Sequence, residues 1–349
     1  FTLSTSDVTN VTIKITPTEI FDATWGNLTM VAVGVMGIKE VKPVEVKAID
    51  IEDGIYEIKN RYDFISLDDI KCKLVYEVDG VKISSKTLNI KNILPRKSKT
   101  LKIKAPEIFS AYLTANFYFY KNGFEIATED LAEVIKEVKN DFPGKKIILL
   151  SHSFGSFVAQ NYIQKYGSEI DACILSGTSI YKKNYATGSL ITKIAIAVKG
   201  PDFKSKFIQN IAFYGYNDRF KNENDEYSWL SANTANREMY RNDAWCGGIS
   251  TASFFKDVIY GLHKINIAKN IRKIPVDLPV LAICGSDDPV SGYGKFVNAL
   301  IKSYKKNGIK TADVKLYMGD RHELFFEENS DTVIQEVIDW IENIIQVSK

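Results

Sequence analysis

Cysteine and histidine are scarce in this sequence, and each shortage narrows the chemistry open to it. Four cysteines, Cys72, Cys173, Cys246 and Cys284, lie far apart in the 349 residues. Without C-x-x-C spacing they predict neither a disulfide framework nor a zinc site, and they favour a reducing compartment. Only three histidines are present, so a reaction that needs an imidazole base has few candidates.

The sequence also lacks a dominant charge and a long apolar run. Forty-five basic and 43 acidic residues give a formal net charge of +2, which gives no sign of a nucleic-acid footprint or of an anionic membrane as partner. No apolar run reaches the length of a membrane span, and no basic-then-apolar leader is visible. We expect a cytoplasmic protein. The chain begins at Phe1 rather than Met, so a removed leader stays open as an alternative.

Residues 1–105 are rich in short alternating runs and predict an all-β, immunoglobulin-like sandwich domain. The runs are VTIKI, LTMVAVGV, VEVKAIDI, GIYEIKNRYDF, CKLVYEVDG and KTLKIKA. Asp53-Gly54 and Asp79-Gly80 are hairpin-turn signals. No catalytic constellation is present here, because the acidic residues sit in turns without a partner histidine.

Residues 145–167 predict a strand, a sharp turn and a helix, with Ser153 at the apex of the turn. The run IILL is typical of a strand buried on both faces, and apolar residues recur at helical spacing after the turn. The hydroxyl of a serine on such a strained turn is exposed above the end of the sheet. The residues two positions before and two positions after the serine must be small. Ser151 and Gly155 meet this need, although the usual pattern has glycine at the first position. We therefore consider Ser153 a candidate nucleophile.

The remainder, residues 106–349, predicts a second domain, of the α/β class, in which helices alternate with strands. Residues 128–142 form an apolar stripe with acids at the start and lysines near the end, which predicts an amphipathic helix. The stretch before it, residues 105–127, fits either an aromatic hairpin turned at Asn122-Gly123 or the lead-in to that helix, and periodicity does not decide between them.

Further strands follow the helix after Ser153, and they alternate with helices. Residues 171–179, 279–290 and 313–327 each contain an apolar strand, which predicts a parallel sheet with functional residues at the carboxyl ends of its strands. The segment 180–275 between the first two is loaded with aromatic residues. We expect it to form a helical cap over a pocket for an apolar substrate; the alternative is that its rings form only the core of the cap.

A serine nucleophile needs a base within hydrogen-bond reach and a carboxylate that orients the base. His152 adjoins the serine and should point elsewhere, and His263 lies in the cap segment. His322 follows a late strand, where the order Ser, Asp, His requires the base. Asp287 and Asp288 both follow the preceding strand; we choose Asp288 and expect Asp287 to be a loop-capping or solvated carboxylate. The ordered set Ser153, Asp288 and His322 indicates acyl transfer to water.

Residues 123–345 resemble the α/β-hydrolases grouped with monoacylglycerol lipases, lysophospholipases and serine aminopeptidases. The matching runs are ILLSHSFGSFVAQNYIQKYGSEIDACILSGT, WLS, CGG, CGSDDPVSGYGKFV and KLYMGDRHELFFE. The resemblance implies that Ser153 is the nucleophile, Asp288 the orienting acid and His322 the base. It also implies that the backbone N–H of Phe154 is one donor to the oxyanion.

One departure from this family concerns the strands that should precede residue 145. Members carry four more strands there, with a His-Gly loop that gives the second oxyanion donor, and no His-Gly pair occurs in this sequence. The predicted sheet is therefore truncated, and its open edge needs a cover. Residues 110–126, the sandwich or a second copy in a homo-oligomer are the alternatives.

Residues 37–104 resemble the small β-sandwich domain of β-galactosidase-type glycoside hydrolases of family 2. The run GIYEIKNRYDFISLDD carries most of the likeness. The chain has no pattern for the catalytic barrel of that family, so the resemblance implies a scaffold and no glycosidase activity.

These observations predict a serine hydrolase of carboxylic esters that acts on a small-molecule acyl ester such as a monoacylglycerol or a lysophospholipid. The expected reaction needs no metal and no cofactor. The alternatives are a catalytically weak or inactive hybrid that serves as a binding or association module, and a sandwich that binds carbohydrate.

Overall fold

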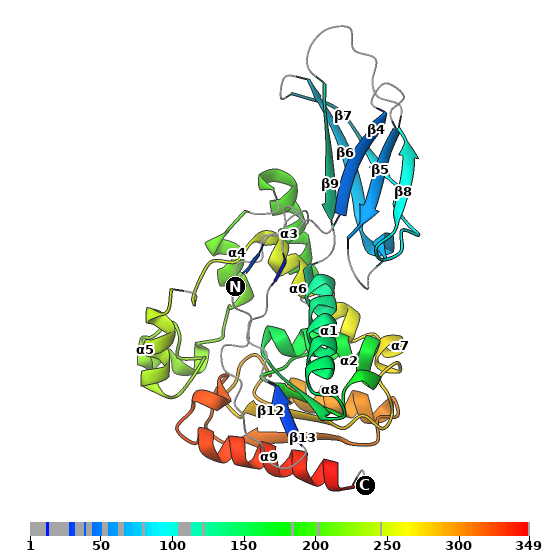
Figure 1. Ribbon diagram of the computed structural model, residues 1–349. Coiled ribbons are helices and arrows are strands. Elements are labelled where there is room, and N and C mark those ends of the chain that lie inside the picture. The colour runs from blue at the N-terminus through cyan, green and yellow to red at the C-terminus, as the bar shows by residue number, and fades with distance from the viewer. Residues whose placement is uncertain are drawn as a thin grey trace. The chain divides into compact units, whose positions relative to one another are not determined.

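The computed structural model contains two compact units, one made mostly of residues 127–349 and the other mostly of residues 34–126 (Figure 1). The residues it describes are 12–13, 28–31, 38–39, 44–50, 55–61, 66–78, 81–103, 113–120, 123–182, 185–200, 203–244 and 246–347.

The first unit contains the predicted parallel sheet. Within the described residues it has five strands, in the order β13-β12-β11-β10-β2. They are β2 (Leu28–Val31), β10 (Lys146–His152), β11 (Ala172–Ser176), β12 (Val280–Gly285) and β13 (Ala312–Tyr317). Every residue of β11 and β12 is buried, as expected for parallel strands covered on both faces.

Successive strand residues face opposite cores because the side-chain period of a strand is two. Leu149 and Leu175 belong to the core that contains residues of α1 (Gly123–Asp141), α2 (Phe154–Tyr166) and α8 (Lys295–Lys306). Ile148 and Ile174 belong to the core that contains residues of α9 (Ser330–Val347). The sheet therefore has helices on both faces (Figure 1).

Strand β2 corrects one sequence-based expectation. The sequence places the run LTMVAVGV in the sandwich, yet Leu28–Val31 pairs in parallel with β10, with Lys146 opposite Leu28 and Leu149 opposite Val31. The open edge of β10 is thus paired with a strand from residues 1–105, the range predicted as the sandwich, and not with residues 110–126 or a second copy. An unpaired edge leaves backbone groups without partners, which explains why an apolar strand is recruited there.

The segment between β11 and β12 is a helical insertion at the predicted place. Its elements are α3 (Tyr185–Lys199), α4 (Lys206–Ala212), η3 (Asp218–Glu223), α5 (Thr234–Asn242), α6 (Ala252–Ile265) and α7 (Ala268–Ile271). Its core contains Ile208, Ala252 and Phe255, whereas Leu190, Ile194 and Val198 are exposed along α3. The unit also contains two short 3-10 helices, η2 (Gly167–Glu169) after α2 and η4 (Leu324–Phe326) after β13.

The second unit is the predicted β-sandwich, built from two antiparallel three-stranded sheets among its described residues (Figure 1). One sheet has the order β4-β5-β8 and the other β7-β6-β9. Their bounds are β4 (Val44–Asp50), β5 (Ile55–Asn60), β6 (Lys71–Val78), β7 (Val81–Leu88), β8 (Ser98–Lys102) and β9 (Leu113–Tyr120), with η1 (Leu67–Asp69) between β5 and β6. The short pair β1 (Thr12–Ile13) and β3 (Ile38–Lys39) is separate.

The described residues of the stretch 105–127 belong to strand β9 and to the start of helix α1. Strand β9 pairs along its whole length with β6 of the sandwich, past the predicted boundary at residue 105. Gly123 is the first residue of α1, so the hairpin alternative is wrong, and this helix begins five residues before the predicted start at 128. The hairpin signals Asp53-Gly54 and Asp79-Gly80 lie outside the described residues.

Candidate active site

Ser153 stands at the turn between β10 and α2, as the sequence predicts. Its backbone has φ 51° and ψ −123°, a conformation that non-glycine residues rarely adopt. Such strain costs about 1–3 kcal/mol and persists only where the surroundings enforce it. Here the Ser153 N–H donates to the Ser176 carbonyl at 3.0 Å, and the Ser156 N–H donates to the Ser153 carbonyl at 2.9 Å. Neighbouring Ser151 donates its hydroxyl to the Ile174 carbonyl at 3.0 Å.

The structure brings the three predicted side chains together at the carboxyl edge of the sheet. His322 Nε2 lies 2.9 Å from Ser153 Oγ, and His322 Nδ1 lies 3.1 Å from Asp288 Oδ1. Asp288 and His322 are 0% and 2% exposed. Asp288 Oδ1 also accepts a hydrogen bond from the Val290 N–H at 2.8 Å, which fixes the carboxylate. The three groups form one continuous hydrogen-bonded chain.

Asp287 lies apart from this chain, as expected. Its Oδ1 pairs with Arg219 Nη1 at 2.9 Å on a partly exposed surface. Asp288, in contrast, is buried against the histidine.

His152 differs from the expectation that it should point elsewhere. Its ring packs against that of His322, with centroids 4.6 Å apart, and its Nδ1 lies 3.2 Å from Ser176 Oγ. Burial, and secondarily the charge of His322, lowers the pKa of His152 well below its usual value. His152 is therefore neutral at pH 7. His263 makes an edge contact with Tyr181, 5.0 Å between centroids, within the insertion.

Gly177 packs directly against the His322 ring, where a larger residue would not fit. It follows β11 with φ 57°, and a Cβ there would lie 2.8 Å from His322 Cε1 and 2.9 Å from its Nδ1. Both the backbone conformation and the contact therefore require glycine at this position.

Aromatic residues of the insertion lie next to the histidine. The Trp229 ring is 5.2 Å from His322 and is stacked on Phe213 at 5.6 Å, and Tyr216 meets Trp229 edge-on at 5.1 Å. Burial raises the pKa of Tyr216, so its phenol stays neutral. Phe254 of α6 lies 5.4 Å from Phe154, the first residue of α2. The rings thus form an apolar surface beside Ser153 and His322.

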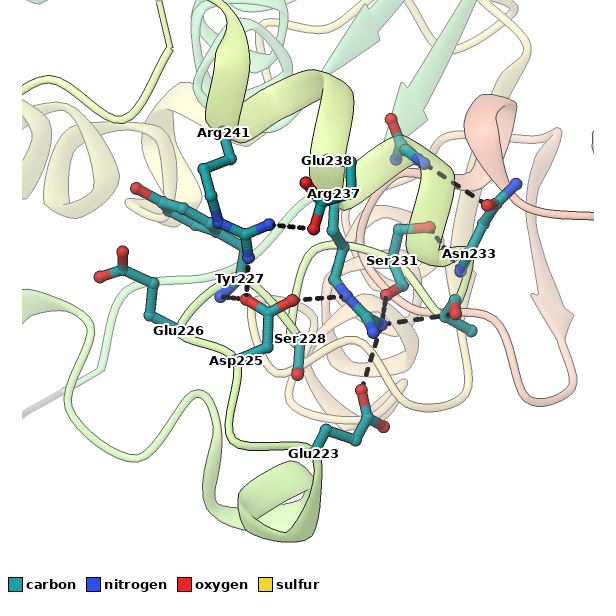
Figure 2. A network of polar contacts seen from close by, with 12 residues as sticks. Glu223, Asp225, Glu226, Tyr227, Ser228, Ser231, Asn233, Arg237, Glu238 and Arg241 are labelled. Atoms are coloured by element: carbon teal, nitrogen blue, oxygen red, sulfur yellow. Dashed lines mark hydrogen bonds and ion pairs between the residues drawn. The ribbon is translucent and has the colours of Figure 1, made fainter.

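The sequence did not predict that two charged residues of the His322 loop would be buried and bonded to the insertion. Arg321 and Glu327 are buried and bonded to residues 223–233 of the insertion (Figure 2 shows the insertion side of this network). Their place beside His322 in GDRHELFFE was visible, but nothing in the pattern identified their partners, which lie about ninety residues away in the chain.

The part of the chain that the structure describes holds no cluster of three metal-ligating side chains. All four cysteines are free, and burial raises the pKa of the Cys72 thiol to about 12. None of the helices described is long and apolar enough to cross a membrane.

Comparison with known proteins matches residues 118–329, more than half of the chain, to the model of the serine aminopeptidase family S33. This chain belongs to that family. It is therefore a member of a family of serine hydrolases, in agreement with the resemblance seen in the sequence. Residues 56–132 match domain 4 of β-galactosidase, which also agrees with the sequence-based prediction.

Solved structures agree with the α/β-hydrolase fold of this family member. A thermostable carboxyl esterase from Bacillus coagulans is 24% identical with a TM-score of 0.59, covering 62% of this chain and 71% of the esterase. A lipase in its open form is 19% identical with a TM-score of 0.59, covering 64% of this chain and 73% of the lipase. No curated protein matches the chain.

Proposed function

We propose that this protein hydrolyses carboxylic esters that carry an apolar acyl group, with Ser153 as nucleophile, His322 as base and Asp288 as orienting acid. The hydrogen-bonded chain from Ser153 Oγ through His322 to Asp288 carries the proposal, at 2.9 and 3.1 Å. The first distance is within the range in which proton transfer from nucleophile to base is feasible, and the second is that of a hydrogen bond that orients the base.

The reaction follows from these contacts. His322 Nε2 takes the proton of the Ser153 hydroxyl as Oγ attacks the ester carbonyl, and the Asp288 carboxylate stabilises the imidazolium through Nδ1–H. The imidazolium then gives its proton to the departing alcohol, which leaves an acyl group on Ser153. His322 then deprotonates a water molecule that attacks the acyl carbon; the acyl–Oγ bond breaks, the acid leaves, and the imidazolium returns the proton to Ser153 Oγ.

The Phe154 N–H is the proposed donor to the oxyanion, since it belongs to the residue after the nucleophile and begins α2. The aromatic rings of Phe154, Phe254 and Trp229 support an apolar acyl group, because they lie beside the reacting residues. The choice of ester over amide draws support from the esterase and the lipase that share the fold.

The test is covalent labelling. The wild-type protein is treated with a fluorophosphonate probe, the labelled residue is identified by mass spectrometry, and hydrolysis of p-nitrophenyl butyrate is measured. We expect labelling at Ser153, and loss of both labelling and turnover in Ser153→Ala. Ser303→Ala on α8 is a matched control and should keep both activities. Absence of labelling in a folded wild-type protein would favour the alternative of a catalytically inactive hybrid. That alternative is based on the absence of a His-Gly pair from the sequence.

A further inference from the structure

The residues on either side of His322 are bonded to the helical insertion. Strand β13 ends at Tyr317, so the histidine is carried by a loop. Arg321 Nη1 donates to the Ser228 carbonyl at 2.6 Å, and the Glu323 N–H donates to the Leu230 carbonyl at 2.8 Å. The position of the histidine loop therefore depends on the turn at residues 228–231 of the insertion.

Glu327 provides a second connection. It is 3% exposed, and its two carboxylate oxygens accept hydrogen bonds from both segments. Oε1 accepts from the Arg321 N–H at 3.0 Å and from the Ala232 N–H at 2.9 Å. Oε2 accepts from Ser231 Oγ at 2.9 Å and from the Asn233 N–H at 3.1 Å. One buried carboxylate thus joins the histidine loop to residues 231–233, and such charge-assisted bonds are the stronger kind.

Ion pairs reinforce the same contact from the insertion side. The guanidinium of Arg321 binds both carboxylate oxygens of Glu223. Arg237 pairs with Glu223 at 3.1 Å and with Asp225 at 2.9 Å, and Arg241 also pairs with Asp225 (Figure 2). The hydrogen bond from Arg321 holds the pKa of Glu223 below its usual value, so the carboxylate is charged at neutral pH.

The turn that accepts these bonds also carries Trp229. Its ring lies 5.2 Å from that of His322, and the backbone N–H of Trp229 donates to Asn217 Oδ1 at 2.9 Å. Movement of the turn would therefore shift both the backbone beside the histidine and the ring packed against it.

We propose that Arg321 and Glu327, together with Glu223, residues 228–233 and Arg237, form a clamp by which the insertion positions His322 for its reaction with Ser153. This inference rests on the proposed function. Its physical reason is the steep dependence of catalysis on geometry, since a displacement of about 1 Å can cost about a hundredfold in rate. Arg321 and Glu327 touch no reacting atom, so both are positioning residues that act through His322.

The test removes the charge of Glu327 in the full chain, and it measures both kcat and the fraction of molecules in which Ser153 can be labelled. In Glu327→Gln the amide group must turn one N–H donor toward backbone N–H groups, which weakens the clamp at nearly constant volume. We expect kcat for p-nitrophenyl butyrate to fall 10- to 100-fold while KM stays within about threefold. The fluorophosphonate probe should still label nearly every molecule at Ser153, but more slowly.

Glu238→Gln is the matched control. Glu238 is in the same insertion, is 58% exposed and pairs with Arg241, and we expect less than a twofold change. Ser231→Ala removes one hydroxyl from Glu327 and should lower kcat about three- to tenfold, which keeps the test decisive should Glu327→Gln fail to fold.

A merely structural role makes a different prediction. The fraction of molecules that the probe can label would then fall, while kcat of an untreated sample, divided by that fraction, stayed at the wild-type value; that result would overturn the clamp. Failure of the wild-type protein to label at Ser153 would instead overturn the proposed function and the clamp with it, so the two failures are distinguished by the wild-type sample.

Discussion

The sandwich and the parallel-sheet unit bury different kinds of side chains. Among the residues of 44–103 whose side chains the structure describes, Asn60 is the one buried polar residue, and its amide donates to the Ile93 carbonyl at 3.0 Å. The sheet unit buries many, and Asp288, Arg321, His322 and Glu327 lie in the loops at one edge of its sheet. Burial of a polar group is costly unless it is satisfied. The side chains described in the sandwich core are almost all apolar, whereas this edge of the sheet gathers the buried polar groups on which the proposed reaction depends.

The largest expected effect tests the chemical side of this contrast. Asp288→Asn keeps the shape of the side chain but removes the charge that orients His322. We expect kcat to fall by about 10⁴-fold, the size of effect seen when the orienting acid of such a triad is neutralised. Turnover of p-nitrophenyl butyrate and near-ultraviolet circular dichroism measure activity and fold. A loss below tenfold in a folded variant would remove Asp288 from its proposed role.

Gly285→Ala should damage packing and chemistry together. A Cβ at Gly285 would lie 2.0 Å from the Asp320 carbonyl oxygen and 2.3 Å from that of Arg321. Backbone atoms cannot move aside cheaply, so we expect a loss of about 3 kcal/mol or more in the free energy of unfolding. The displaced histidine loop should also lower kcat. Gly248→Ala, where no described atom lies within 4 Å of the new Cβ, should change neither; urea unfolding and turnover provide the comparison.

Ile58→Ala tests the packing side. Ile58 is 0% exposed in the sandwich core, and truncation of a buried isoleucine costs about 2–5 kcal/mol. We expect the unfolding transition of the sandwich to move to lower urea concentration. The kcat of the untreated protein, divided by the fraction of molecules that the fluorophosphonate probe can label, should not change. Ile49→Ala in the same sheet, at a side chain 54% exposed, should change stability by about 0.5 kcal/mol or less. Altered turnover in Ile58→Ala would break the contrast between the units.

The smallest expected effect concerns His152. Its pKa in the folded protein is below that of the unfolded chain because of burial, so the unfolded chain binds more protons. The free energy of unfolding is therefore not reduced by protonation of His152 above about pH 6.5, and it decreases as the pH falls below that value. Between pH 7 and pH 5.5 the wild type should lose about 1 kcal/mol that His152→Gln does not lose. Urea unfolding at the two values measures the difference, and equal pH dependence in both proteins would refute the assignment.

Much of the candidate site could be predicted because its signals are local. A buried apolar run, Ser153 and a helical pattern are contiguous, and parallel strands bring their carboxyl ends to one edge, which placed Asp288 and His322 nearby. The partner of β2 could not be predicted, since short apolar runs such as LTMV fit a parallel or an antiparallel neighbour equally well. The packing of His152 against His322 likewise depends on where β10 lies beside β11.

Side-chain periodicity and turn chemistry act over a few residues, so the sequence is enough to predict the strand-turn-helix around Ser153, the order of the acid and the base, and the all-β character of the region before them. Contacts between distant segments decide which strand pairs with the edge of the sheet and which charges meet at the histidine loop. The physical reason is that 45 basic and 43 acidic residues offer many pairings of similar local pattern. Burial in the folded chain selects Arg321 with Glu223, and Glu327 with the turn at residues 231–233.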